Sequence, residues 1–353
     1  TITYPPGYNS ILSGSGTATL TVTGVYMVFD NRTLFLPDLP DLTISGHGTV
    51  PLPKAFFDGR FLPGLHRLSY AAGVSTAFAD FTVNATGVFS YAPTFEGVFQ
   101  GSGTGVLTLN GAIIQINNSF LSAPDLRITA LYPNSPAPRS TFTAAVLPGV
   151  HVASYESSAA GQDAAVAFTV NPNSTVSYGP TLQGILLGNN TGILTLQGAA
   201  IAADNSSLSS TSVNLGGVYD LTPAPNTALN LRLLPGDHDI SYPSTPTAGR
   251  AATAFAVNPD ATVSYAPDQQ GVLLGAGTSA LTIRGRDLVI DNSYLLATNT
   301  ELFGVGALAN DTSAVTLLPG THAVRYQASA ANPAAGADFS MLASGTVDYD
   351  PSL

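Results

Sequence analysis

Four histidines stand at equivalent positions of a recurring Leu-Pro-Gly-x-His pattern, and each is followed four residues later by a tyrosine. Residues i and i+4 of a strand lie on the same face, so each imidazole can approach its tyrosine. Such a pair suits a sugar-binding platform, and clustered imidazoles suit a metal ion. The pairs are His66 with Tyr70, His151 with Tyr155, His238 with Tyr242, and His322 with Tyr326.

Two interpretations of these pairs remain open. In the first, each histidine is structural and hydrogen-bonds a neighbouring loop at a strand corner. In the second, the pairs form a repeated binding site. A metal ion needs three or four converging ligands, which one histidine per copy supplies only if the copies close into a ring. No metal and no cofactor are therefore predicted, and His47, outside the pattern, is expected in a loop.

Acidic and amide residues recur where the second apolar run of each copy ends. Carboxylates beside amides can bind Ca²⁺, but such residues also favour turns, because their side chains imitate a turn of the backbone. One copy has asparagine in place of aspartate, which favours turns. The pairs are Asp30-Asn31, Asn117-Asn118, Asp204-Asn205 and Asp291-Asn292.

The composition excludes several classes of function. The 353-residue chain has a net charge of −11 and scattered basic residues, so nucleic-acid binding is not expected. No apolar run approaches the ~20 residues of a membrane helix, and membrane insertion is not expected. The absence of Cys excludes thiol catalysis and disulfides. Nucleophile-elbow, metalloprotease and phosphate-loop motifs are absent as well, so no enzyme activity is predicted.

Seven N-x-S/T sequons are candidate N-glycosylation sites. Asn-rich turns with a nearby Ser or Thr explain them equally well. They are Asn31, Asn84, Asn117, Asn173, Asn189, Asn205 and Asn310.

A phrase centred on tyrosine recurs about every 87 residues and divides the chain into four copies. It reads TITYPP, VFSYAP, TVSYGP, TVSYAP and TVDYDP along the chain. Such a period indicates tandem structural units. The expected boundaries give a surplus N-terminal strand (1–5), then copy 1 (6–92), copy 2 (93–179), copy 3 (180–266) and copy 4 (267–353).

The elements of each copy are predicted to be strands. Leu-Thr-Leu runs after a glycine turn alternate with period 2. In the Leu-Pro-Gly turn, Pro fixes φ and Gly supplies a positive φ, as type II requires. A hairpin with an Asn-Pro-Asn/Asp turn closes the copy, as at 167–178 and 254–265. Six or seven short strands per copy predict an all-β fold of four tandem β-sandwich-like (Ig-like) repeats.

The order GxGTxxLTxxGxxxxxDN, LPGxHxxxY and FxVNPxxTVSY resembles tandem β-repeats of secreted actinobacterial proteins without an assigned activity. The resemblance covers nearly the whole chain. The LPGxH corner is also similar to surface domains of the PEGA type. Both resemblances imply an extracellular β-protein, and neither brings catalytic residues to this chain.

Charged residues make up only 9% of the chain, against about 25% in ordinary soluble domains. With abundant Gly, Ser, Thr and Asn, this favours a secreted structural protein of a cell surface or matrix. One alternative is an array of carbohydrate-binding modules with a glycan partner. A weaker one is a secreted hydrolase, whose site would lie in the insertion of copy 1 at 35–61.

Residues 1–5 copy the strand that closes every unit, so the chain has one surplus strand. An unpaired strand can add to the sheet of another molecule. Insertion into the last copy of a neighbour would join subunits head to tail, and contacts that do not close produce filaments. The alternative is that residues 1–5 pair within copy 1.

Overall fold

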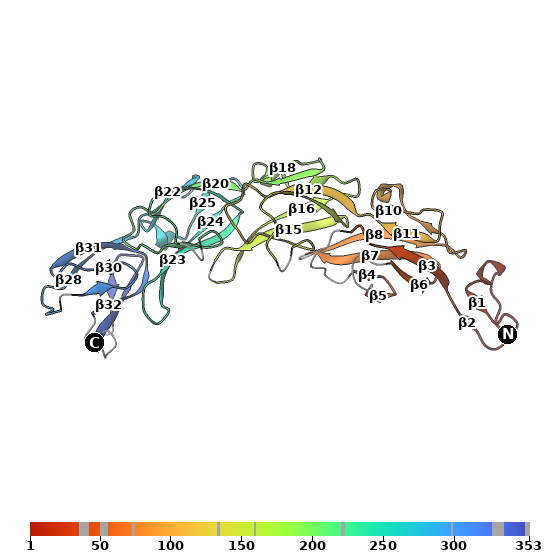
Figure 1. Ribbon diagram of the computed structural model, residues 1–353, viewed down its shortest axis with the longest axis horizontal. Coiled ribbons are helices and arrows are strands. Elements are labelled where there is room, and N and C mark those ends of the chain that lie inside the picture. The colour runs from red at the N-terminus through yellow and green to blue at the C-terminus, as the bar shows by residue number, and fades with distance from the viewer. Residues whose placement is uncertain are drawn as a thin grey trace. The chain divides into compact units, whose positions relative to one another are not determined.

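The chain consists of strands and turns in the computed structural model (Figure 1). The structure describes residues 1–34, 42–49, 56–72, 75–132, 135–158, 160–219, 223–297, 299–326 and 335–349. These residues contain no α-helix, which confirms the prediction of an all-β fold. Their only helical elements are four 3₁₀ turns after the tyrosine phrases: η1 (Pro6–Tyr8), η2 (Pro93–Phe95), η3 (Pro180–Leu182) and η4 (Pro267–Gln269).

Contacts divide the chain into two compact units. The first comprises Thr1–Phe120, Leu126–Ala153 and Val166–Gln197, and the second Leu121–Asp125, Ser154–Ala165 and Gly198–Leu353. Strands β15 (Gly149–Glu156) and β16 (Asp163–Val170) contribute residues to both units.

The first unit contains four small sheets and part of a fifth. The first sheet pairs β1 (Leu12–Ser13) with β2 (Thr21–Val22). The second runs β10 (Phe99–Gln100), β11 (Val106–Leu109), β3 (Val25–Asp30) and β6 (Phe56–Phe61), and the third runs β5 (Gly48–Thr49), β4 (Thr43–Ile44), β7 (Gly64–Ala72), β8 (Ser75–Val83) and β9 (Phe89–Ser90). The fourth runs β14 (Thr141–Val146), β12 (Ala112–Asn117), β19 (Ile193–Leu196) and β18 (Leu186–Leu187), and the sheet shared with the second unit runs β13 (Arg127–Ile128), β15, β16 and β17 (Val176–Ser177).

The second unit contains a four-stranded sheet, a two-stranded sheet and a nine-stranded sheet. The smaller sheets are β22 (Ala228–Leu233), β20 (Ala199–Asp204), β27 (Ala280–Ile283) and β26 (Leu273–Leu274); and β28 (Arg286–Asp291) with β31 (Thr312–Leu317). The large sheet runs β21 (Asn214–Leu215), β23 (Gly236–Pro243), β24 (Arg250–Val257), β32 (Gly320–Tyr326), β29 (Glu301–Leu302) and β30 (Gly306–Ala307), with β25 (Val263–Ser264) on β24, β33 (Ala335–Met341) on β32, and β34 (Val347–Asp348) on β33.

Alternating burial explains why these segments form half-buried strands. In β12, Ala112, Ile114 and Ile116 are buried while Ile113 and Gln115 are exposed. Successive side chains of a strand point to opposite faces, so this sequence presents one apolar face to a core. The same alternation occurs in β16.

Pairs of sheets enclose the cores. In the first unit, the Phe29 ring of β3 lies 5.7 Å from Phe81 of β8 and 5.2 Å from Phe89 of β9, so residues of two sheets meet. In the second unit, Leu317 of β31 and Leu302 of β29 belong to one buried cluster. Burying each such side chain stabilises the fold by roughly 1.5–3 kcal/mol.

The sheets do not follow the copy boundaries expected from the sequence. Three times, a strand of the following copy lies parallel to a strand of the preceding one: β11 beside β3, β19 beside β12, and β27 beside β20. In these three sheets, a strand of the following copy therefore completes a sheet of the copy before it, so the sheets cross the boundaries expected from the sequence.

The surplus strand at residues 1–5 pairs within copy 1, which was the alternative that the sequence left open. The Ile2 amide donates to the Thr17 carbonyl (3.1 Å), and the Gly16 amide donates to the Ile2 carbonyl (2.9 Å). The neighbouring hairpin, β1 with β2, forms a sheet of only two strands in the described chain. Its apolar residues Leu20 and Val22 are 42% and 55% exposed.

Candidate functional site: contacts around the Leu-Pro-Gly turns

Each of the four histidines hydrogen-bonds the leucine carbonyl of its own Leu-Pro-Gly turn. A carbonyl only accepts, so the imidazole proton is assigned to Nε2. The distances are 2.9 Å for His66–Leu62, 3.1 Å for His151–Leu147, 3.0 Å for His238–Leu234 and 2.9 Å for His322–Leu318. The histidines therefore stabilise the turns between strands, as in the structural interpretation.

Three of these imidazoles are closed off from water. His151, His238 and His322 are at most 1% exposed, whereas His66 is half-buried. Each buried ring stacks on a phenylalanine of its own copy, as His238 does on Phe255 at 5.4 Å. Their Nδ1 atoms have no hydrogen-bond partner among the described residues. Burial lowers the pKa of all three, because the charged form would lose its hydration, so they are neutral at pH 7.

The tyrosines meet the following copy rather than the histidine four residues before them. In three of the four, the hydroxyl accepts a hydrogen bond from the amide of the next Leu-Pro-Gly leucine. The pairs are Tyr70 with Leu147 (2.9 Å), Tyr155 with Leu234 (3.0 Å) and Tyr242 with Leu318 (3.1 Å). Burial raises the pKa of all three hydroxyls.

Histidine and tyrosine rings do come together, but between copies. The centroids of Tyr155 and His238 lie 6.0 Å apart, as do those of Tyr242 and His322, and Tyr70 lies 6.3 Å from His151. Tyr326 is half-buried and meets no further turn of this kind among the described residues. The repeat spacing contained a signal for these contacts, since each tyrosine precedes the next leucine by 76 to 79 residues, but strand periodicity pairs only residues within one copy.

The Leu-Pro-Gly turn also contacts the preceding copy through its backbone. The Pro235 carbonyl accepts from the Ala165 amide at 2.9 Å. At Gly236, φ is +139°, and a Cβ added there would lie 2.8 Å from the Ala164 Cα. Only glycine fits this approach. The same contacts recur at the other two turns, with Pro148 and Gly149 near Ala77, and Pro319 and Gly320 near Ala251.

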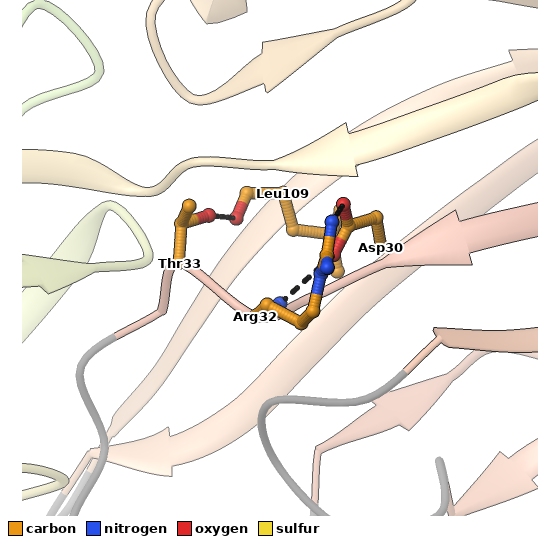
Figure 2. A network of polar contacts seen from close by, with 4 residues as sticks. All are labelled: Asp30, Arg32, Thr33 and Leu109. Carbon is orange, nitrogen blue, oxygen red and sulfur yellow. Dashed lines mark hydrogen bonds and ion pairs between the residues drawn. The ribbon is translucent and has the colours of Figure 1, made fainter.

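The parallel strands form the second contact between copies. In Figure 2, the Thr33 hydroxyl donates to the Leu109 carbonyl of β11, beside the end of β3. Asp30 at that end pairs with Arg32 at 2.9 Å, and the hydrogen bonds from Arg32 lower the pKa of the Asp30 carboxyl. The end of β3 is thus held against the first long strand of copy 2.

The candidate calcium residues form turns. The side-chain oxygen of each accepts the backbone amide two residues later: Asp30 from Arg32, Asn117 from Ser119, Asp204 from Ser206, and Asp291 from Ser293. Within the described residues, no group of three His, Cys, Asp or Glu side chains is placed to hold a metal ion.

The seven sequons differ in accessibility. Asn31 and Asn205 are 1% and 3% exposed, so neither can carry a glycan in the folded chain. Asn117 is half-buried, and its side chain bonds Ser119. The others are exposed and remain candidate sites: Asn84, Asn173, Asn189 and Asn310.

Copy 1 contains the last candidates. His47 lies in the turn between β4 and β5, where its ring stacks on Phe61 at 4.3 Å. Of the insertion at 35–61, residues 35–41 and 50–55 lie outside the described chain. The described remainder forms β4, β5 and β6.

One groove of the second unit carries acidic side chains. Asp237, Asp239 and Asp268 line it together with Tyr265 and Gln269. The Tyr265 hydroxyl accepts from the Ala276 amide at 3.3 Å, and Gln269 accepts from Thr253 at 2.8 Å. Two of its polar groups are thus occupied by the fold itself.

Six of the eight predicted site residues, all except His66 and Tyr326, therefore take part in contacts between neighbouring copies. Buried neutral imidazoles and buried tyrosines offer no proton or ring face to a ligand. No known protein family, curated protein or solved structure matches this chain. Among the described residues, no helix has the length and apolar character to span a membrane.

Proposed function

We propose that the chain is an extracellular structural protein of a cell surface or matrix, made of four tandem β-sandwich-like repeats. One observation carries the proposal: the chemically capable residues that recur, histidine and tyrosine, lie in the contacts between copies. Tyr155 illustrates this, because its buried hydroxyl accepts from Leu234 of the following copy. A chain whose repeated residues join its repeats is suited to a continuous structural role.

An array of carbohydrate-binding modules would repeat exposed aromatic rings, since sugars stack on ring faces. The recurring tyrosines Tyr70, Tyr155 and Tyr242 are at most 2% exposed. Among the exposed aromatics, Phe120 and Tyr294 occupy equivalent positions of copies 2 and 4, at 52% and 92%, but copies 1 and 3 have Thr33 and Ser207 there, so no exposed aromatic ring recurs in every copy of the described chain. These exposures favour the structural role.

The experiment compares Tyr155→Phe with Tyr326→Phe while single molecules are stretched between their termini. Tyr155→Phe leaves the buried Leu234 amide without its acceptor, which costs roughly 1–3 kcal/mol, so the force needed to separate that contact falls. Tyr326→Phe is the matched control, because its hydroxyl meets no such amide in the described chain.

Two results would count against the proposal. The first is a glycan that binds the native chain and is lost in Tyr155→Phe at unchanged stability, which would identify a binding array. The second is antibody labelling of producing cells only after permeabilisation, which would exclude a cell surface or matrix.

A further inference from the structure

The fourth copy has an open core. Between β28 and β33 lies an apolar groove of about 370 Å³. Leu288, Ile290, Val324 and Phe339 line it, and all four are only half-buried. Their counterparts in copies 1 to 3 are at most 4% exposed: Met27, Ile114 and Ile201; Phe29, Ile116 and Ala203; Leu68, Ala153 and Ile240; and Phe81, Phe168 and Phe255.

The cores of the other copies are closed by a hairpin of the following copy. Leu107, Leu194 and Leu281 of its parallel strand are at most 1% exposed, and each lies opposite an inward-facing residue: Phe29, Ile116 and Ala203. In copy 4 the counterpart strand β28 pairs only with β31 among the described residues. Val289, on its outer face, is 64% exposed.

A hairpin of the right form is present at the other end of the chain. β1 and β2 pair Leu12 with Val22, the register in which β10 and β11 pair Phe99 with Leu109. Leu109 is 0% exposed, whereas its counterpart Val22 is 55% exposed. The β1–β2 hairpin thus pairs in the same register as a hairpin that closes a core, while Leu20 and Val22 face solvent.

We propose that the groove of copy 4 binds the β1–β2 hairpin of a second copy of this chain. The register follows from the internal contacts: Thr19 lies opposite Val289, Leu20 opposite Ile290, and Thr21 opposite Asp291. Leu20 and Val22 then fill the groove, and β2 supplies the parallel strand. This deepens the proposed structural function, on which it rests, by naming the partner.

The remaining contacts between copies also have unfilled counterparts at both ends. Leu62 of the first Leu-Pro-Gly turn is 54% exposed, whereas Leu147, Leu234 and Leu318 are fully buried. Its amide matches the hydroxyl of Tyr326, in the arrangement of Leu234 with Tyr155. Apart from its chain neighbours, no described residue has an atom within 4 Å of a Cβ built on Gly64, which leaves room for the strand that packs on the other turns.

Leu295, which follows β28, is a further residue of copy 4 that lacks the contact its counterparts make with the following copy among the described residues. Leu34, Leu121 and Leu208 are at most 4% exposed, and each lies against a glycine of the following copy, Gly111, Gly198 or Gly285. The counterpart Leu295 is 44% exposed, and its partner would be Gly24 of the second molecule.

Docking replaces one contact within the chain, that of Ile2 with Gly16 and Thr17, by a contact between two molecules. Within the chain, Phe89 of copy 1 bonds Gly103 and Thr104 of copy 2. Its counterpart in copy 4 is Val347, which would bond Gly16 and Thr17 of the second molecule. Ile2 now occupies those two positions. Residues 1–5 therefore compete with docking, and their deletion strengthens association.

The test begins with sedimentation of the 353-residue chain over a concentration series. Head-to-tail docking gives a ladder of species beyond the dimer, because each addition exposes a new groove. Leu20→Asp and Ile290→Asp, one on each partner surface, each lower association at least tenfold, because Leu20 lies opposite Ile290 in the proposed register. Ile113→Asp is the matched control, since Ile113 is an outward strand residue away from both surfaces, with an exposure (55%) similar to that of Leu20 (42%).

Cysteine pairs test the register, because the chain has no cysteine of its own. Thr19→Cys and Val289→Cys, on separate molecules, form a disulfide when mixed, since paired strands bring Cα atoms within the range that a disulfide spans. Thr19→Cys mixed with Ile113→Cys does not. Strengthened association after deletion of residues 1–5 supports the exchange at Val347.

Monomers at every concentration, association unchanged by both Asp substitutions, or loss of association after deletion of residues 1–5 would overturn the docking. These results leave the stretching and surface-labelling experiments untouched. The inference and the proposed function can therefore fail separately.

Discussion

At the residue scale, the histidines of the Leu-Pro-Gly-x-His pattern illustrate how a chemically capable residue becomes structural. Nε2 is committed to a carbonyl, and the ring lies between a phenylalanine of its own copy and a tyrosine of the preceding one. For His238 these are Phe255 and Tyr155. Protonation would place a charge where no described group pairs with Nδ1.

This burial predicts a dependence of stability on pH. The unfolded histidines take up protons near pH 6.5, while the pKa values of folded His151, His238 and His322 are lower. The unfolded state then binds more protons, so the stabilising contribution is complete above pH 6.5 and is lost as the pH falls toward the folded pKa. The slope is at most about 1.4 kcal/mol per pH unit for each histidine.

Urea unfolding at pH 7.5, 6.5, 5.5 and 4.5 measures this slope. The lowered pKa values of Asp30, Asp204, Asp260 and Asp291 affect stability mainly below about pH 5, so the histidine contribution is read from the slope between pH 7.5 and 5.5. His238→Gln keeps an N–H donor for Leu234 and removes one titrating group, so its slope is shallower. Equal slopes in the two proteins would contradict a buried neutral His238.

At the scale of elements, the Leu-Pro-Gly turn joins copies as well as strands. Gly64 and Gly236 both have positive φ, at +147° and +139°, but only Gly236 approaches another backbone. Alanine at either position costs roughly 1–3 kcal/mol in backbone strain. At Gly236 the clash with Ala164 adds roughly 1–3 kcal/mol.

Hydrogen exchange of the amides near each turn compares Gly236→Ala with Gly64→Ala. The former loses protection at Ala165 and Leu234, on both sides of the contact, while the latter loses it only near its own turn. Equal losses would mean that the close approach to Ala164 does not limit the side chain at this position.

The turns and strands could be predicted from the sequence because their causes are local. The proline and glycine of the turns, the alternation of β12 and the Asx turn at Asp204 each depend on neighbouring residues. The partner of Tyr155 could not be predicted in this way, since Leu234 belongs to the next copy. The strand order could not be predicted for the same reason: alternation shows that β19 is a strand with one buried face, and leaves open which copy it completes.

At the scale of the whole molecule, the parallel strand pairs across the expected copy boundaries predict which fragments fold. Residues 112–196 begin with β12 and end with β19, so they contain the parallel pair. Residues 93–179, a complete copy by the sequence phrase, carry β12 but lack β19. Without β19, the second fragment lacks the strand that lies beside β12, so Ile114 and Ile116 are left partly exposed to solvent.

Thermal melting of the two fragments, which are nearly equal in length, tests this prediction. Residues 112–196 give a cooperative transition, and residues 93–179 melt at a lower temperature or without cooperativity. A higher melting temperature for 93–179 would show that the sequence phrase, and not the parallel strand pair, bounds the folding unit.

The parallel strand that each copy supplies to its predecessor also bears on how such a gene grows. A duplicated segment arrives with a core that its own residues cannot close and a hairpin that its own core cannot use. Inserted between existing copies, it receives a strand from its successor and gives one to its predecessor. Lengthening by internal duplication therefore preserves every contact without compensating mutations.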